Sequence, residues 1–344
     1  MGTNTAEKRY GWMKPFKIGE ISAEAGAKAY GELKVAELPD GTWTSIPLVI
    51  VNGAESGSIL AVVAGMGGVD FSAIEAARRV ILNTDPKKLK GTLLIVPIAN
   101  RPAFLTRSTA NIFENTQTDL FSAFPGSPAG SLTPRIADCL LNEVIYKANY
   151  FIAISNLTPG ACYTPFTSFY PAPTKEMKDK LLELAKAFGT RFLGDAEGPR
   201  GRDRDKYPGR SHMLANSRGI LSILSFCGES GRVDEESVKV HARGITNIMK
   251  YISMIKGQPE VPAEQVVCNS WLNDLRAKRG GFFRSHVKLA EHVSKGQTLG
   301  DVTNLLYETK EQIKSPVDGY IIRITTTPTI SGGDVVFGIW YREE

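Results

Sequence analysis

The sequence predicts an α/β protein with a mixed, mainly parallel sheet flanked by helices, followed by a small all-β C-terminal domain. First, the apolar run 59–64 is typical of a strand buried on both faces, and it leads into a glycine turn at 65–68. Second, residues 72–82 resume with apolar residues at helical spacing, and such strand–helix alternation continues to residue 255. Third, short β runs between Gly and Pro turns fill residues 267–344.

The expected elements follow from this alternation. Strands are expected at 16–18, 30–38, 45–51, 58–64, 92–99, 150–154 and 219–226. Helices are expected at 72–82, 134–147, 174–188 and 234–255. Long loops are expected between residues 100 and 130 and again after residue 155, where Pro, Thr and Gly accumulate.

Local signals mark several boundaries of these elements. Pro39-Asp40-Gly41, between two β-rich runs, predicts a hairpin. Thr133 is expected to cap the second helix, with Pro134 at its first position. Gly257 is expected to end the last helix, which has its apolar residues on one face. Beyond this point the composition changes, and we predict two domains, residues 1–262 and 263–344.

Composition and charge are those of an ordinary globular protein. The chain has 344 residues, 22% charged and 42% hydrophobic, and a net charge of +5 with both signs interspersed. These values indicate neither nucleic-acid nor membrane binding. No run approaches the roughly 20 apolar residues of a membrane span, and residues 1–17 have no signal-peptide core. Four cysteines without CxxC spacing suggest buried free thiols, so we expect a cytoplasmic protein.

Several segments resemble one known family, in order along the chain. They are 49–53, 58–65, 74–76, 91–100, 102–104, 119–120, 124–126, 219–220, 231–232 and 234–255. Together they resemble the succinylglutamate desuccinylase/aspartoacylase family, relatives of the zinc carboxypeptidases. The C-terminal segments 295–300 and 315–319 add to this resemblance, which implies a zinc carboxypeptidase-like fold followed by a β domain resembling a barrel-sandwich hybrid.

The resemblance implies hydrolysis of an amide or ester bond in a small acylated amino acid. In the family, a His-x-x-Glu pair after the first core strand and a His after a later strand hold zinc. The zinc polarises the carbonyl group and activates water, a glutamate serves as general base, and arginines bind the oxyanion and the substrate carboxylate.

This sequence departs from the family pattern at the positions that carry the chemistry. Gly67-Gly68-Val69-Asp70 stands where the His-x-x-Glu pair is expected, and Ser155 stands at the later His. The family's Asp-Leu-Asn-Arg motif becomes Asp119-Leu120-Phe121-Ser122, and Phe226 stands at the general base. We therefore expect neither a metal nor another cofactor at this site.

Three carboxylates are the candidate acid/base residues: Asp70, Asp119 and Glu229. Glu229 follows the position of the lost base by three residues, and the alternative is a solvated loop glutamate. Arg101 and Arg107 both follow the second core strand, where the family keeps an oxyanion-binding arginine. Of the two, Arg107 is the preferred candidate for binding a substrate anion.

Six further residues are candidates for ligand contacts: Gly67, Gly68, Ser155, Asn156, Tyr163 and His212. The two glycines could offer backbone N–H groups to an anion or simply form a tight turn. Tyr163 belongs to an aromatic segment that could line a pocket or form a dimer contact. Cys227 is interpreted as an inert buried thiol, and the charged loop 198–206 as a solvated loop or a lid.

Three functions remain open from the sequence. The leading one is a metal-independent enzyme acting on a small, anionic amide- or amino-acid-like compound. The alternative is a non-catalytic protein that binds a small molecule or a partner, and a homo-oligomer is compatible with either. The third is a zinc-dependent amidohydrolase or deacylase with substitute ligands, for which His212, Asp70 and Asp119 are the candidates. The C-terminal module is expected to be unmodified, because Glu308 stands where biotinyl and lipoyl carriers have their lysine.

Overall fold

The structure, a computed structural model, describes residues 14–114, 118–156, 159–169, 174–195 and 210–342. The charged loop 198–206, interpreted above as a solvated loop or a lid, lies within residues 196–209, outside the described ones.

The strands and helices of the described residues have the following bounds. The strands are β1 (Phe16–Ile18), β2 (Ile21–Ala23), β3 (Ala27–Glu37), β4 (Trp43–Asn52), β5 (Glu55–Val63), β6 (Lys90–Val96), β7 (Tyr150–Ser155), β8 (Ala161–Phe169), β9 (Phe192–Asp195), β10 (Leu221–Gly228), β11 (Val266–Cys268), β12 (Ser270–Arg276), β13 (Gly281–Ser285), β14 (His292–Val293), β15 (Thr298–Thr303), β16 (Thr309–Lys314), β17 (Gly319–Thr325), β18 (Thr329–Ile330) and β19 (Val335–Tyr341). The α-helices are α1 (Phe71–Asn83), α2 (Arg101–Leu105), α3 (Leu132–Cys139), α4 (Lys175–Phe188), α5 (Ser211–Ser217) and α6 (Glu235–Tyr251). Short helical turns are η1 (Pro86–Lys88), η2 (Leu120–Ser122), η3 (Leu140–Val144) and η4 (Ile145–Lys147).

The centre of the main sheet is parallel. Strands β10, β7, β5 and β6 lie in that spatial order, and each neighbouring pair is parallel. Antiparallel strands extend both sides, with β4 and β3 beyond β6, and β8 beyond β10. This arrangement confirms the predicted fold class. It also brings the carboxyl ends of four strands to one edge, the place where open α/β sheets bind ligands.

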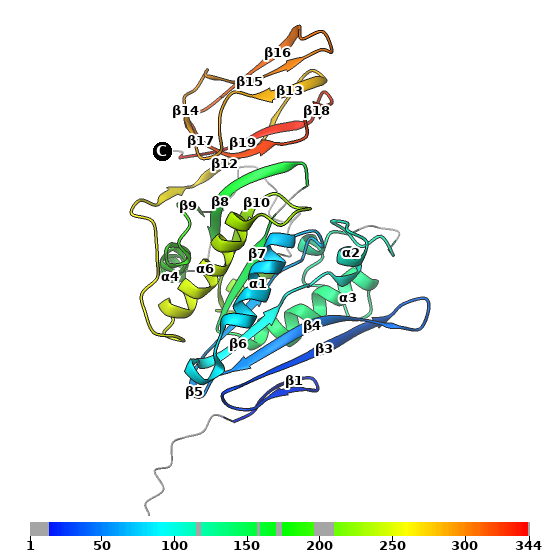
Figure 1. Cartoon of the computed structure of the whole chain (residues 1–344), viewed down its shortest axis with the longest axis vertical. Coiled ribbons are helices and arrows are strands. Elements are labelled where there is room, and N and C mark those ends of the chain that lie inside the picture. The colour runs from blue at the N-terminus through cyan, green and yellow to red at the C-terminus, as the bar shows by residue number, and fades with distance from the viewer. Residues whose placement is uncertain (1–13, 115–117, 157–158, 170–173, 196–209, 343–344) are drawn as a thin grey trace, which may run out of the picture.

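Helices cover both faces of this sheet (Figure 1). Helices α1, α4 and α6 pack on one face, where their aliphatic side chains meet those of the central strands. Helices α3 and α5 pack on the other face. The continuous apolar runs of the central strands follow from this double covering, because both faces of the sheet exclude water.

The sheet continues without a break into the C-terminal module. Strand β17 pairs antiparallel with β8, and β19 and β12 extend the same sheet. A second sheet, with the order β16-β15-β13-β18, packs on it over a separate apolar core. The module therefore adjoins the α/β part through backbone hydrogen bonds (Figure 1).

An aromatic cluster fills the joint between the two parts. The ring of Phe166 lies 5.1 Å from Phe226, 5.9 Å from Trp271 and 4.7 Å from Trp340, measured between centroids. Strand β11 lies after the predicted boundary at residue 262 but pairs with β9 of the α/β part. The two predicted domains thus share a sheet and a core. The boundary at residue 262 remains a prediction.

Two loops of the sequence analysis are structured. Residues 161–169, expected within a loop, form β8. Pro165 lies where the register of β8 against β10 shifts, and such an irregularity accommodates a residue that lacks an N–H donor. Residues 211–217, for which no element was expected, form α5. Tyr163 and Phe166 are consequently core residues and not part of an aromatic loop.

Two helix boundaries also differ from expectation. Helix α3 begins at Leu132 after Ser131, and a side chain distant in sequence caps it: Glu114 Oε1 accepts the Thr133 N–H at 2.7 Å. Thr133 is therefore not the cap. Helix α6 ends at Tyr251, six residues before Gly257.

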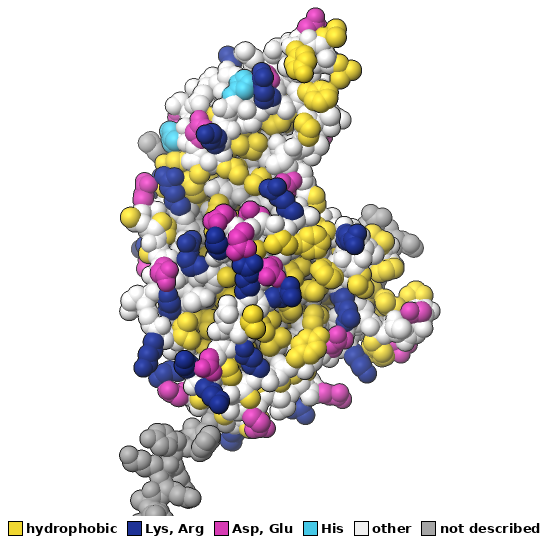
Figure 2. Space-filling model, viewed as in Figure 1, with side chains coloured by type: hydrophobic (Ala, Val, Ile, Leu, Met, Phe, Trp, Pro, Cys, Tyr) yellow, Lys and Arg dark blue, Asp and Glu magenta, His cyan; other side chains and the backbone are white. Residues whose placement is uncertain are grey.

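The surface seen in Figure 2 carries interspersed basic and acidic side chains. Apolar side chains gather at the outer end of the C-terminal module, over the hairpin of β15 and β16 (Figure 2). Leu305, Leu306 and Tyr307 are strongly exposed there. Within the described residues, the helices are all too short or too polar to span a membrane.

Candidate functional site

Asp70 lies at the centre of the strand edge, directly before α1, and its side chain is fully buried. Its Oδ2 accepts hydrogen bonds from the Gly67 N–H at 3.0 Å and from the Ser155 hydroxyl at 3.1 Å. Its Oδ1 accepts from the Ser230 hydroxyl at 3.2 Å. Burial raises the pKa of Asp70 to about 6, and these donors, together with the Asn156 backbone, oppose that rise.

The positions of the family's expected zinc ligands meet around this carboxylate. A Cβ atom at Gly67 would lie 2.9 Å from Asp70 Oδ1, so the carboxylate occupies the space toward which a side chain at 67 would project. Ser155 contacts the same group from the end of β7. Gly68 has a φ of +63°, and a Cβ there would lie 2.4 Å from the Ser108 carbonyl oxygen. The glycine turn is therefore packed against the segment after α2, which favours the tight-turn interpretation.

Asn156 holds the edge together. Its Oδ1 accepts from the Ala73 N–H at 3.0 Å in the first turn of α1, and its Nδ2 donates to the Cys227 carbonyl at 2.7 Å. The side chain is fully buried. Asn156 thus joins α1, β7 and β10, and its contact with a ligand stays a prediction.

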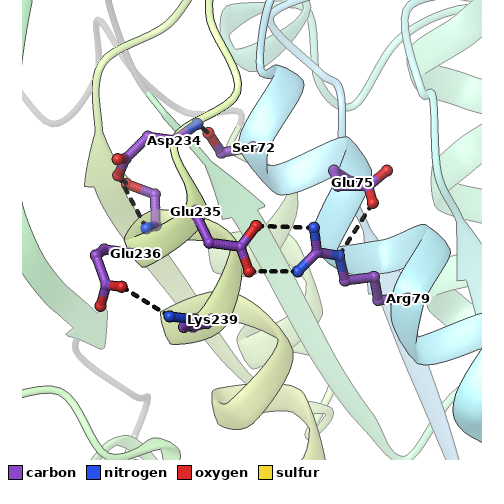
Figure 3. A network of polar contacts seen from close by, with 8 residues as sticks. Ser72, Glu75, Arg79, Asp234, Glu235, Glu236 and Lys239 are labelled. Atoms are coloured by element: carbon purple, nitrogen blue, oxygen red, sulfur yellow. Dashed lines mark hydrogen bonds and ion pairs between the residues drawn. The ribbon is translucent and has the colours of Figure 1, made fainter.

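A polar network fixes α1 against α6 beside the site (Figure 3). Arg79 forms two hydrogen bonds with Glu235, at 2.6 and 2.9 Å, and a third with Glu75 at 3.0 Å. Ser72 Oγ accepts the N–H of Asp234, the residue that caps α6. These contacts hold the start of α1 next to the turn that follows β10, and this turn contains Ser230.

Glu229 lies at the same edge but contacts the C-terminal module. Its Oε1 accepts from the Thr326 hydroxyl at 2.7 Å, and its Oε2 lies 3.7 Å from the Arg232 guanidinium. The side chain is 17% exposed. Oε1 is therefore engaged in a contact between the two parts of the chain, and within the described residues Oε2 has a loose ion pair alone.

Asp119 and His212 take part in other contacts than those of Asp70. Asp119 caps η2, where its carboxylate accepts from the Phe121 N–H and the Ser122 hydroxyl. Burial raises the pKa of Asp119, while Arg210 opposes this. The His212 carbonyl accepts from Ser222, six residues and roughly 20 Å along β10 from Gly228. Burial holds the pKa of His212 well below its usual value.

The two arginines of the sequence analysis also fall outside this cluster. Arg101 Nη1 pairs with Glu32 of β3 at 2.9 Å and donates to Ser45. Arg107 is exposed and has a positive φ of 52°. Asn100, directly before Arg101, does face the site, since its Nδ2 lies 3.4 Å from the Met66 carbonyl.

The cysteines show no sign of nucleophilic activation. All four are free thiols, as predicted. Cys227 and Cys268 are buried, which confirms their predicted burial, whereas Cys139 and Cys162 are half-buried. Burial raises the pKa of Cys227 to about 12, and its Sγ donates to Ser237 at 3.4 Å. This environment supports the interpretation of Cys227 as an inert thiol.

Two residues at this edge escaped the sequence analysis. Ser230, which donates to Asp70, directly follows Glu229, the acid/base candidate of this turn. Arg323 of β17 stacks near the ring of Tyr163, with its guanidinium carbon 5.9 Å from the ring centroid. Ser230 could have been found from the Gly228–Gly231 turn, but nothing in the sequence pairs Arg323 with Tyr163.

The residues present do not fit zinc at the inherited position. Gly67 has no side chain, the Ser155 hydroxyl is directed to Asp70, and both Asp70 oxygens accept from N–H or O–H donors. A ligating carboxylate would direct at least one lone pair at the metal instead. Across the described part of the chain, no group of three or more His, Cys, Asp or Glu side chains is arranged to hold a metal ion.

The fold and the position of the Asp70 cluster together define a class of protein. It is an α/β protein with a parallel central sheet, a candidate site at the carboxyl ends of the central strands, and a C-terminal β module. Residues 56–252, more than half of the chain, match the model of the succinylglutamate desuccinylase/aspartoacylase catalytic domain. The chain belongs to this family.

Individual relatives cover nearly the whole chain. It is 23% identical over 310 residues to the N-alpha-acetyl-L-2,4-diaminobutyric acid deacetylase of Halomonas elongata, covering 87% of this chain and 86% of that protein. Its fold is similar to the product-bound ectoine utilization protein EutE from Ruegeria pomeroyi, with a TM-score of 0.80, 20% identity and coverage of 91% and 94%. It is also similar to a succinylglutamate desuccinylase/aspartoacylase from Rhodobacter sphaeroides, with a TM-score of 0.78 and 20% sequence identity. The match covers 92% of this chain and 95% of that one.

Proposed function

We propose that this protein binds a small, anionic amide- or amino-acid-like compound at the carboxyl edge of its sheet and does not hydrolyse it by the family's zinc chemistry. Family membership supports the ligand class, since the relative from Halomonas elongata is named as a deacetylase of an N-acetylated amino acid. The closed environment of Asp70 supports the lack of zinc chemistry.

The observation that carries this proposal is that hydrogen-bond donors of the protein surround the Asp70 carboxylate. An ionised carboxylate has about four lone-pair positions. Gly67, Ser155 and Ser230 donate to it, and the Asn156 backbone also favours its ionised form. A general base needs a free lone pair within hydrogen-bond reach of the proton it removes. Asp70 therefore serves this site as a structural anion and not as the acid/base residue predicted from the sequence.

A second candidate function is metal-independent hydrolysis of the same class of compound with Glu229 as general base. The specific observation in its favour is the geometry of Glu229: among the described residues, the nearest partner of its Oε2 is Arg232 at 3.7 Å. The residue follows the end of β10, next to Ser230. Substrate-assisted loosening of this ion pair would leave Oε2 able to accept a proton from water.

One experiment separates these functions. N-acetyl-L-2,4-diaminobutyrate is titrated into untagged protein by calorimetry, and release of acetate is followed in parallel, each with and without a chelator. The proposal predicts chelator-insensitive binding without acetate release. Acetate release that needs zinc would contradict it. Chelator-insensitive release that falls at least about 100-fold in Glu229→Gln would establish the second candidate instead.

A further inference from the structure

We propose that Arg323, on β17 of the C-terminal module, binds the carboxylate of the ligand at this site. The inference rests on the proposed function, and it assigns the anion-binding role to a residue outside the family's catalytic domain. In the sequence analysis this role fell to Arg107, which is exposed, or to Arg101, which is paired with Glu32.

The first observation is an unsatisfied cation. Nη1 of Arg323 is buried and has no hydrogen-bond partner among the described residues, while the residue as a whole is half-buried. No other arginine or lysine nitrogen of the described residues is buried in this condition. A buried donor without an acceptor costs free energy, more so when the donor is charged. A bound carboxylate would supply the missing acceptor.

The second observation is the position of Arg323 in the sheet. It pairs with Tyr163 of β8, and Tyr163 pairs with Gly228 at the end of β10. On the next strand, Phe226 of β10 pairs with Ser155 of β7. Arg323 is thus three strand spacings, roughly 14 Å, from the strand that supplies Ser155 to Asp70. A small acylated amino acid and an arginine side chain together span such a distance.

The third observation is that aromatic and polar contacts hold Arg323 at this edge. The guanidinium lies over the ring of Tyr163, at 5.9 Å from its centroid, and Tyr163 is itself packed in the core. Three residues further along the chain, Thr326 donates to Glu229 at the end of β10. An arginine that is placed in advance loses little side-chain entropy on binding, and its planar fork matches a carboxylate.

This assignment gives the C-terminal module a role in binding. Its sheet is continuous with the catalytic-domain sheet through β8 and β17, so Arg323 is held relative to the strand ends by backbone pairing. The module completes the site by supplying its cation.

The test uses the full-length protein with two probes and two variants. In Arg323→Met the stem that packs on Tyr163 is kept and the charge is lost. The matched control is Arg279→Met, at an exposed arginine of the same module. Affinities are measured for N-acetyl-L-2,4-diaminobutyrate and for its carboxamide, which lacks the negative charge. Thermal unfolding is measured in succinate against sodium chloride at equal ionic strength.

We expect the wild type and Arg279→Met to bind the acid about 10- to 100-fold more tightly than the carboxamide, and Arg323→Met to lose this preference. Succinate should raise the melting temperature of the first two proteins only, and without ligand Arg323→Met should melt no lower than the wild type. An unchanged succinate effect in Arg323→Met, no succinate effect in the wild type, or a large loss of stability without ligand would overturn the assignment. If succinate acts through Arg323 while neither acylated probe binds, the anion site stands and the proposed ligand class is wrong.

Discussion

The Ser155 hydroxyl lies 3.1 Å from Asp70 Oδ2, although 85 residues separate the two in the chain. The contact joins the end of β7 to the start of α1, at the positions where the family resemblance implies a histidine and a glutamate that share a zinc ion. Here a serine donates to an aspartate, and the backbone of Gly67 adds a second donor. A network of hydrogen bonds closes the site where the family's pattern implies a metal.

The raised pKa of Asp70 makes stability depend on pH. A carboxyl group whose pKa rises from 3.8 to about 6 on folding binds its proton more tightly in the folded state. Its contribution, about 3 kcal/mol, is therefore fully present below pH 4 and is lost as the pH rises through 6. We expect the free energy of unfolding of the wild type to fall by about this amount relative to Asp70→Asn between pH 4 and pH 7.

Urea unfolding of both proteins at several pH values measures this difference. The comparison removes the contributions of the other titrating groups, which are common to both proteins. A difference that stays constant across this range would show that Asp70 titrates normally.

Asn156 offers a test of the structural role assigned to it. Asn156→Ala would leave the Ala73 N–H and the Cys227 carbonyl without their partners in a buried region. We expect a loss of about 2–4 kcal/mol in the free energy of unfolding, from two unpaired groups. Asn142→Ala, at an exposed asparagine of η3, should change it by less than about 0.5 kcal/mol. Equal effects of the two substitutions would rule out this bridging role.

The shared core predicts that the two parts of the chain unfold together. Phe166 is fully buried and contacts Phe226 of the α/β part and Trp271 and Trp340 of the C-terminal module. We expect Phe166→Ala to cost about 3–5 kcal/mol and to lower a single transition, seen alike by tryptophan fluorescence and by circular dichroism. Two separate transitions in the wild type would mean that the C-terminal module is an independent unit.

The sequence predicted those features that depend on local pattern or on a general rule of sheet topology. The buried run before Gly65 and the helix after it were found because their periodicities are strong. The contact between Asp70 and Ser155 agrees with the rule that parallel strands end at one edge of a sheet. The hairpin at Pro39-Asp40-Gly41 is confirmed, since Gly41 has a positive φ and β3 pairs with β4.

The features that were missed depend on contacts between distant segments. Strand β8 contains Pro165, and pairing with β9, β10 and β17 holds it in the sheet. Arg323 acquires its place through the same pairing, and Glu114 caps α3 from outside the helix. The acid/base role of Asp70 was inferred from its residue type and its position after the first core strand, and only the structure shows that both its oxygens accept hydrogen bonds. The fold was therefore more predictable than the site.

The zinc content of the untagged protein, by elemental analysis, tests the central claim most directly. It is combined with ligand binding before and after chelation. A catalytic zinc site needs about three protein ligands, and of the inherited positions only Asp70 offers a charged one, already occupied by its donors. We predict far less than one zinc per chain and binding that the chelator leaves unchanged. Close to one zinc per chain, with activity that a chelator removes and zinc restores, would contradict the account.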